Sequence, residues 1–395
     1  MGDIRDYLEW RGDVTLAERP FNDVDNVIMA SLSYLDLTGI APGPGEGTRT
    51  LRACLEDLLA KAGDDLSPYV RSLATIDLRF VRALAASARF GGAAVRDYVD
   101  EVDADKVLQF AALTVDLDDG NSLVSFRGTD STLVGWQEDF MLSFTVMESQ
   151  VAAAKYLQTE LEVAAADGNH VLVCGHSKGG VLATYAAVSV PAELRDVIAH
   201  VWSDDGPCMD SLVVAARPHD VFGDRLTHVV PAYDVVGMLF DDGRPRLVVA
   251  SSAEGALQHD PMTWQCTADA LVEAQGLDPE ALRLDQAIHD WVDQIPMDER
   301  ARFTQEFFEV LQAGGATTLD EVTGSVSGAQ KVLAALSDAD QRTKDLVGTL
   351  FAGVVSAQVA STYQRWSTGL AEAASAAAEA ASASLGDLLG RSDGQ

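Results

Sequence analysis

The chain has 395 residues, of which 47% are hydrophobic, and its 61 acidic and 28 basic residues give a formal net charge of −33 at pH 7. This length allows a large core and suits one large domain with an appended segment. Nucleic acids and anionic membranes are bound through clusters of Lys and Arg, which this sequence lacks, so the charge argues against both as partners.

The cysteines and the ends of the chain narrow the expected class further. The four cysteines show no close-paired metal-ligand spacing. The first residues, Met1–Asp6, lack a basic region followed by an apolar core, so we expect no signal peptide. The longest apolar stretch, Leu346–Ala360, has 15 residues and falls short of a membrane span. A cytoplasmic protein without a transmembrane segment or a bound metal is therefore the expectation.

The first hundred residues have a mostly helical pattern. Apolar residues recur at helical spacing after a capped start at Phe21–Asp25, and the pattern continues over Arg49–Ala62 and Pro68–Arg89. The period then changes, and six apolar runs bounded by turns or helical segments are predicted to be strands. These runs are 110–115, 123–126, 171–174, 197–202, 227–232 and 246–250.

Helices are expected between the later strands, over Glu148–Ala165 and Val181–Ala187. Alternation of strands and helices predicts an α/β fold with a mostly parallel sheet covered on both faces. From about Pro279 the pattern is helical again, and Leu370–Ser384 is an Ala- and Ser-rich segment of low complexity. We expect a helical N-terminal part over 1–105, an α/β core over 106–275 and a helical extension with an Ala-rich tail over 276–395.

The motif with the clearest chemistry is Gly175-His176-Ser177-Lys178-Gly179, between a buried strand and a helix. A strand, a sharp turn and a helix with serine at the apex form a nucleophile elbow, in which glycines give the turn room and the strained serine is pushed outwards. The pattern without its context is a weak signal in a chain with 32 glycines. The preceding strand and following helix favour a catalytic Ser177.

A serine hydroxyl becomes a nucleophile when a base takes its proton, and in elbow proteins the partners follow in the order Ser, Asp, His. Asp234 comes just past an apolar strand and is the preferred acid, with Asp204 and Asp205, after the preceding strand, as rivals. An alternative for Asp234 is a helix cap. His259 lies in a loop bounded by glycine and proline and is the preferred base.

Two further groups are expected around this triad. The backbone N–H groups of Thr129 and Lys178 are the predicted oxyanion donors, because Thr129 follows Gly128 after an earlier strand and Lys178 opens a helix. Arg127 is expected to hold this loop through a carboxylate such as Asp139. A downstream apolar patch could bind an acyl chain, form a lid or pack in the core; the candidates are Trp136, Phe140, Met141 and Phe144.

Two blocks together, Phe126–Asp130 and Gly175–Gly180, resemble the class 3 lipase family of α/β hydrolases. The resemblance implies an α/β-hydrolase fold. It maps the family's oxyanion hydroxyl onto Thr129 and the triad onto Ser177, Asp234 and His259. The opening of the chain is similar to a bacterial lipase-like family of unknown function, and this resemblance covers about residues 1–265. Lys178 departs from the class 3 pattern, which usually has leucine there.

These features predict a serine hydrolase of acyl or lipid-type esters that requires no cofactor. The same triad would serve a thioesterase, a peptidase or an acyltransferase. A third hypothesis is a binding or scaffolding protein on a hydrolase fold, which a failure to react with a serine-directed probe would favour. Substrate identity, a lid and the oligomeric state stay open.

Overall fold

In the computed structural model, the described residues are 1–286 except 73, 131–132, 143–144, 210–217, 235, 239–242 and 284–285. The chain forms two compact units, Met1–Asp338 and Ala339–Gln395, and all described residues belong to the first. The predicted helical extension, including Leu346–Ala360 and Leu370–Ser384, lies almost entirely outside the described residues. That it is helical therefore stays a prediction.

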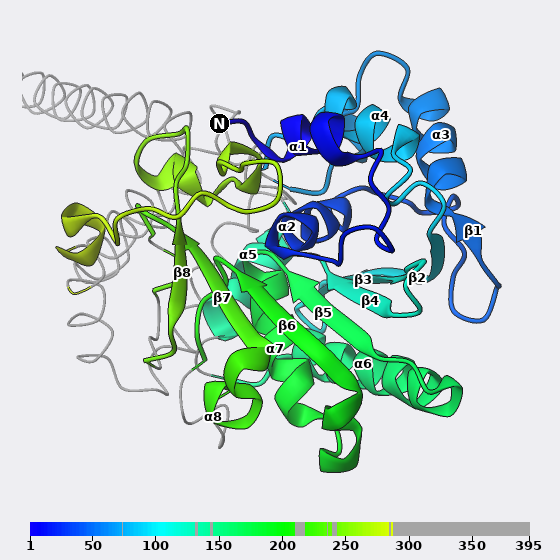
Figure 1. The fold of residues 1–395 in the computed structure, drawn as a ribbon. Coiled ribbons are helices and arrows are strands. Elements are labelled where there is room, and N and C mark those ends of the chain that lie inside the picture. Colours follow the sequence, from blue (N-terminus) through cyan, green and yellow to red (C-terminus); the bar gives the residue numbers. More distant parts are fainter. Residues whose placement is uncertain are drawn as a thin grey trace, which may run out of the picture. The chain divides into compact units, whose positions relative to one another are not determined.

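The described part is built on an eight-stranded sheet in which the strands follow their chain order (Figure 1). The strands are β1 (Arg49–Thr50), β2 (Ala94–Asp103), β3 (Leu108–Asp116), β4 (Ser122–Phe126), β5 (Val171–Gly175), β6 (Ile198–Asp204), β7 (Leu226–Pro231) and β8 (Arg246–Val249). Strands β1 to β4 pair antiparallel, and β4 to β8 pair parallel.

Helices cover both faces of this sheet (Figure 1). They are α1 (Ile4–Arg11), α2 (Asp23–Leu32), α3 (Leu51–Ala62), α4 (Leu78–Ala86), α5 (Leu133–Leu142), α6 (Glu148–Asp167), α7 (Lys178–Ser189) and α8 (Pro218–Phe222). Alternate residues of the central strands enter two apolar clusters, one with α1 to α4 and the other with α6 and α7. Because β5 is buried on both faces, its uninterrupted apolar run is explained.

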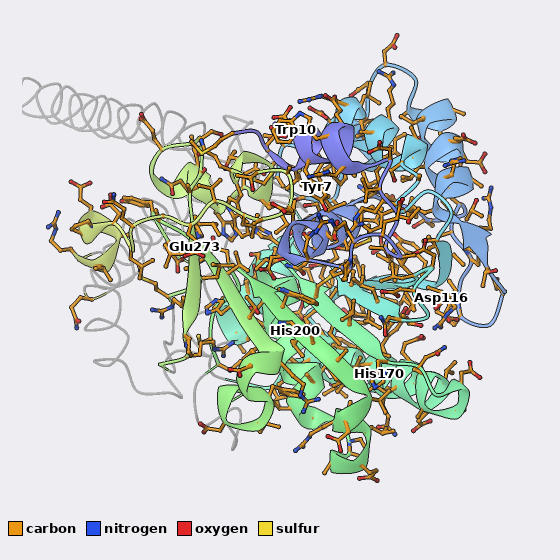
Figure 2. The ribbon with its side chains drawn as sticks, in the orientation of Figure 1. Tyr7, Trp10, Asp116, His170, His200 and Glu273 are labelled. Atoms are coloured by element: carbon orange, nitrogen blue, oxygen red, sulfur yellow. The ribbon has the colours of Figure 1, made fainter. Side chains whose placement is uncertain are left out.

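The N-terminal helices are joined by a buried polar network as well as by apolar packing. Asn22 caps α2 and forms a capping box with Asp25. The Asp25 carboxylate also accepts hydrogen bonds from the hydroxyl of Tyr7 on α1, the residue labelled in Figure 2, at 2.9 Å and from Arg89 Nε at 2.7 Å. Burial of the Asp25–Arg89 ion pair with full hydrogen bonding ties three segments of this layer together.

The α/β-hydrolase fold predicted from the sequence is confirmed, and all six expected strands are present as β3 to β8. Strand β2 was missed, because a bulge between Arg96 and Val99 shifts its register and breaks the alternation of apolar residues. The helix expected over 68–89 is shorter, since α4 begins after its cap at Asp77. Among the described helices, none is long and apolar enough to cross a bilayer.

Candidate active site

Ser177 lies at the turn between β5 and α7, with φ 57° and ψ −128°. This region is strained for a residue with a side chain and is the geometry of a nucleophile elbow. A Cβ at Gly175 would lie 2.2 Å from the Gly179 carbonyl oxygen, and one at Gly179 would lie 2.3 Å from the Phe126 carbonyl oxygen. The glycines of the motif are therefore required by the close approach of backbone.

Residues from five successive strands meet at the carboxyl edge of the sheet. Thr129, Ser177, Asp205, Asp234 and His259 follow β4, β5, β6, β7 and β8 respectively. In parallel strands these ends share one edge, which is where ligands bind in α/β proteins. The fold thus brings together segments that are more than 120 residues apart in the chain.

A continuous hydrogen-bonded chain links three of these side chains. His259 Nε2 lies 3.1 Å from Ser177 Oγ, and His259 Nδ1 lies 2.6 Å from Asp205 Oδ2. Because a carboxylate accepts, Nδ1 carries the ring proton and Nε2 is left to accept from the serine hydroxyl. Serine, imidazole and carboxylate have the order and spacing of a catalytic triad.

The expectation that Asp234 lies against His259 is wrong in this structure, because Asp205 occupies that place. Asp234 lies one strand further along the edge, and its Oδ1 accepts the Gly237 N–H at 2.7 Å. Asp204, the other rival, faces away from the site, and its carboxyl group accepts from Asn26 Nδ2 at 2.8 and 2.9 Å. Adjacent residues at a strand end point to opposite sides, so only one of Asp204 and Asp205 reaches the histidine.

The pKa values around this chain are set mainly by burial. Removal of water raises the pKa of Asp205 to about 7, against hydrogen bonds from Asp234 and the Gly237 N–H that favour its charged form. Burial lowers the pKa of His259 to about 4, against the attraction of nearby carboxylates. A neutral imidazole at neutral pH can accept the serine proton.

His176, next to the serine, contacts His259 but is not part of the hydrogen-bonded chain from Asp205 to Ser177. Its Nε2 lies 2.8 Å from the His259 carbonyl oxygen, which can only accept, so Nε2 carries the proton. Its Nδ1 then accepts from the Tyr34 hydroxyl at 2.8 Å. The His176 ring also packs against the His259 ring, with centroids 4.6 Å apart. Tyr34, which the sequence did not single out, thus supports His259 through one intermediate ring.

His176, Asp205 and His259 could also be considered as metal ligands, because their donor atoms lie within 4.8 Å of one another. Both nitrogens of His176 are occupied by the contacts just described. The nitrogens of His259 face Asp205 and Ser177. The group fits a hydrogen-bonded chain better than a coordination site.

The two predicted oxyanion residues lie in the loop after β4, for Thr129, and at the start of α7, for Lys178. Among the described residues, no protein acceptor is bound by the backbone N–H of Thr129 or Lys178. The Thr129 hydroxyl, in contrast, donates to Asp139 Oδ2 and is already engaged. A Cβ at Gly128 would lie 2.6 Å from the His176 carbonyl oxygen, so this loop also approaches the elbow closely. Free N–H groups here could stabilise a developing oxyanion.

The Lys178 side chain turns away from the serine into the protein. Its ammonium donates to the Gln109 carbonyl oxygen at 2.7 Å and to Glu138 Oε2 at 2.9 Å, and it also contacts Gln109 Oε1. Side-chain exposure is 1% for Lys178 and 0% for Glu138. The charge that departs from the class 3 pattern is therefore paired and buried between α5 and β3.

The remaining predicted residues have mixed outcomes. Arg127 does hold its loop, but through Asp100, which it binds with two nitrogens at 2.7 and 2.8 Å, rather than through Asp139. Met141 lies half-buried on α5. The side chains of Trp136 and Phe140 and the whole of Phe144 are outside the described residues, so an acyl-binding role for this patch stays a prediction.

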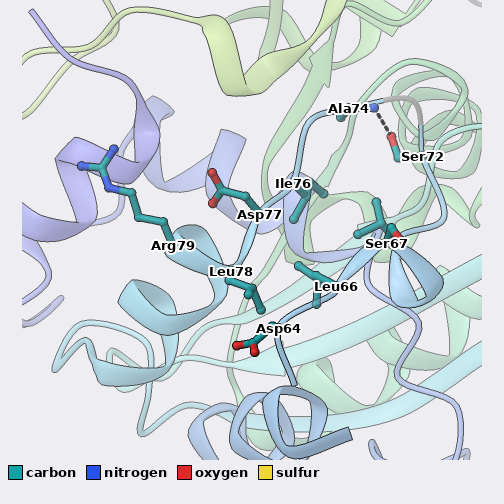
Figure 3. A pocket seen from close by; sticks show the side chains of 10 residues that line it. Asp64, Leu66, Ser67, Ser72, Ala74, Ile76, Asp77, Leu78 and Arg79 are labelled. Atoms are coloured by element: carbon teal, nitrogen blue, oxygen red, sulfur yellow. Dashed lines mark hydrogen bonds between the residues drawn. The ribbon is translucent and has the colours of Figure 1, made fainter. Parts of the chain in front are cut away.

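A separate cavity of about 550 Å³ lies in the N-terminal helical layer (Figure 3). Leu66, Ile76 and Asp77 are among its lining residues, which do not include Ser177, Asp205 or His259. The loop at its edge reaches the site through Thr75, whose hydroxyl donates to Asp260 Oδ2 at 2.6 Å. This cavity is therefore adjacent to the segment carrying His259 but is not where the triad opens.

Comparison with known proteins gives one family and a group of distant structures. No curated protein matches the chain. Solved structures with similarity include a Rhizomucor miehei lipase in complex with its propeptide, with 17% identity, 41% of this chain, 57% of that chain and a TM-score of 0.31. Lipase II of Rhizopus niveus has 12% identity over 75% of this chain and 92% of that chain, with a TM-score of 0.36. Lip2 lipase of Yarrowia lipolytica has 12% identity over 66% of this chain and 87% of that chain, with a TM-score of 0.38.

The chain thus spans little more than half of the Rhizomucor protein, and scores of this size support no argument about activity. The similarity to a bacterial lipase-like family stays a prediction. The Mbeg1-like family model, in contrast, matches residues 84–309, which is more than half of the chain. The matched range contains Ser177, Asp205 and His259. This protein therefore belongs to the Mbeg1-like family.

Proposed function

We propose that this protein is a serine hydrolase that cleaves carboxylic esters of acyl or lipid type. The observation that carries the proposal is the chain from Asp205 Oδ2 through His259 to Ser177 Oγ, with contacts of 2.6 and 3.1 Å, at a strained elbow. Strain of this kind persists only where the surrounding structure enforces it, which is typical of functional sites.

In the proposed reaction, Ser177 Oγ attacks the ester carbonyl carbon as His259 Nε2 takes the hydroxyl proton. The resulting imidazolium keeps its Nδ1–H bond to Asp205, whose negative charge stabilises it. His259 then gives the proton to the leaving alcohol, and the acyl group remains on Ser177. Water, activated by the same imidazole, releases the carboxylic acid and restores the serine.

The backbone N–H groups of Thr129 and Lys178 are proposed to bind the oxyanion of both tetrahedral intermediates. Loss of one donor of this kind typically costs about 2.7–4 kcal/mol in barrier height. Because Glu138 and Gln109 hold the Lys178 ammonium inside the protein, an apolar acyl chain beside the elbow would not meet its charge. Trp136, Phe140, Met141 and Phe144 are the proposed acyl-binding residues.

The test is hydrolysis of p-nitrophenyl esters of increasing acyl length by the wild type, Ser177→Ala and Asp205→Asn. We expect kcat to fall by about 10⁴ or more in Ser177→Ala. In Asp205→Asn, kcat should fall by about 10⁴, because the asparagine amide favours the tautomer of His259 that has its proton, not its lone pair, toward the serine. Equal rates in the wild type and Ser177→Ala would contradict the proposal. A preference for long chains would support the lipid-type substrate.

A further inference from the structure

Two carboxyl groups, not one, lie behind His259. Asp205 and Asp234 are both fully buried, and the single N–H of Gly237 donates to Asp205 Oδ1 at 3.0 Å and to Asp234 Oδ1 at 2.7 Å. Asp205 Oδ1 and Asp234 Oδ2 also border the space that a Cβ at Gly237 would fill, at 2.8 and 3.0 Å. Each carboxyl group also shifts the pKa of the other, and a hydrogen bond between them is among the causes of both shifts.

Two buried carboxylates this close cannot both be ionised without strong repulsion, so the pair holds a proton at neutral pH. The contacts decide which residue holds it. Asp205 accepts two donors, His259 Nδ1–H and the Gly237 N–H, and both favour a negative charge there. Among the described residues, no donor reaches Asp234 Oδ2, the oxygen that borders the space at Gly237 together with Asp205 Oδ1.

We propose that Asp234 is a positioning residue, a neutral carboxylic acid whose Oδ2–H donates a hydrogen bond to the Asp205 carboxylate. The proposal rests on the proposed function for its effect on catalysis. This bond gives Asp205 a third donor, which keeps Asp205 as the ionised member of the pair. The negative charge then lies next to His259. Asp234 thus acts on the reaction through Asp205 and does not touch the serine, the base or the substrate.

The groups that face Asp234 agree with this arrangement. Asp205, from the end of β6, raises the pKa of the Asp234 carboxyl through repulsion and through the shared hydrogen bond, in addition to the effect of burial. Arg246 on β8 and the Gly237 N–H act in the opposite direction and are the weaker influences. His259 contacts Asp205 through Nδ1 at 2.6 Å. Burial lowers the pKa of His259, and the nearby carboxyls of Asp234, Asp260 and Asp139 act in the opposite direction.

The test compares the pH dependence of kcat/KM for ester hydrolysis in the wild type, Asp234→Ala and Asp234→Asn. Asp234→Ala removes the donor, so Asp205 should lose its charge more readily and the acid limb should move up by about one to two pH units. Asparagine keeps an N–H donor of similar shape and should give a smaller shift. Asp204→Asn is the matched control: this buried carboxyl faces Asn26 and also repels Asp205, so its loss should not move the limb up.

Movement of the acid limb to lower pH would overturn the proposal, because it would mean that Asp234 is ionised and repels Asp205. A loss of about 10⁴ in Asp234→Asn with near wild-type turnover in Asp205→Asn would also overturn it, by making Asp234 the triad acid. Infrared difference spectra read the proton without activity. The difference spectrum of the wild type minus Asp234→Asn at neutral pH should contain the carbonyl band of a protonated carboxyl. Its absence from this difference contradicts the inference even if no ester is cleaved.

Discussion

The buried pair of Lys178 and Glu138 gives the sharpest stability prediction. Glu138→Gln preserves shape but removes the negative charge beside an ammonium that is 1% exposed. Loss of one partner of a buried ion pair typically costs about 3–5 kcal/mol, because the other charge is left uncompensated. Since Lys178 keeps two contacts with Gln109, we expect the lower end, about 3 kcal/mol in the free energy of unfolding.

Urea unfolding followed by circular dichroism measures this loss. For a slope of about 1–3 kcal/mol/M, the midpoint of Glu138→Gln should fall by roughly 1–3 M. The double variant Glu138→Gln with Lys178→Met removes the stranded charge and should recover much of the stability. At urea concentrations where it is still folded, Glu138→Gln should retain ester turnover, because Glu138 does not contact the triad. A loss under about 1 kcal/mol, or no recovery in the double variant, would refute the buried-pair reasoning.

Three further outcomes are expected. Gly179→Ala places a Cβ 2.3 Å from a backbone carbonyl of β4 and should abolish turnover and lower the melting temperature, whereas Gly92→Ala meets nothing within 4 Å and should do neither. Thr129→Val removes the hydroxyl that donates to Asp139 but keeps the N–H, so kcat should fall by less than the roughly 10²–10³ typical of a direct oxyanion donor; a full loss would show hydroxyl contact with the oxyanion. Because burial raises the pKa of Asp205 to about 7, kcat/KM should fall as pH drops below 7, where the anion is lost, and a rate independent of pH there would contradict this assignment.

Much of the fold could be predicted because its determinants are local. The apolar run of β5, the glycines at 175 and 179 and the following helix specify an elbow from a few adjacent residues. Strand β2 could not be predicted in the same way, since a bulge at Asp97, with φ 53°, puts its apolar residues out of phase. A strand cannot be predicted from the alternation of apolar residues where one bulged residue shifts that alternation.

The expected acid failed for a different reason. Asp205 and Asp234 both follow neighbouring parallel strands, β6 and β7, at the same edge of the sheet. Asp205 has a positive φ of 48°, which directs its side chain toward His259. A sequence signal exists in the Gly206-Pro207 pair, which follows Asp205 and marks a turn just past the end of β6. The contacts of Tyr34, Gln109 and Glu138 join distant segments and have no local signal.

The central claim is that Ser177 is an activated nucleophile. The most direct measurement is intact-mass spectrometry after exposure to a fluorophosphonate, followed by peptide mapping of the adduct, for the wild type and Ser177→Ala. We expect a single adduct on Ser177, formed more slowly in Asp205→Asn and absent from Ser177→Ala. A folded wild type that forms no adduct, or one that is labelled at another residue, would contradict the account.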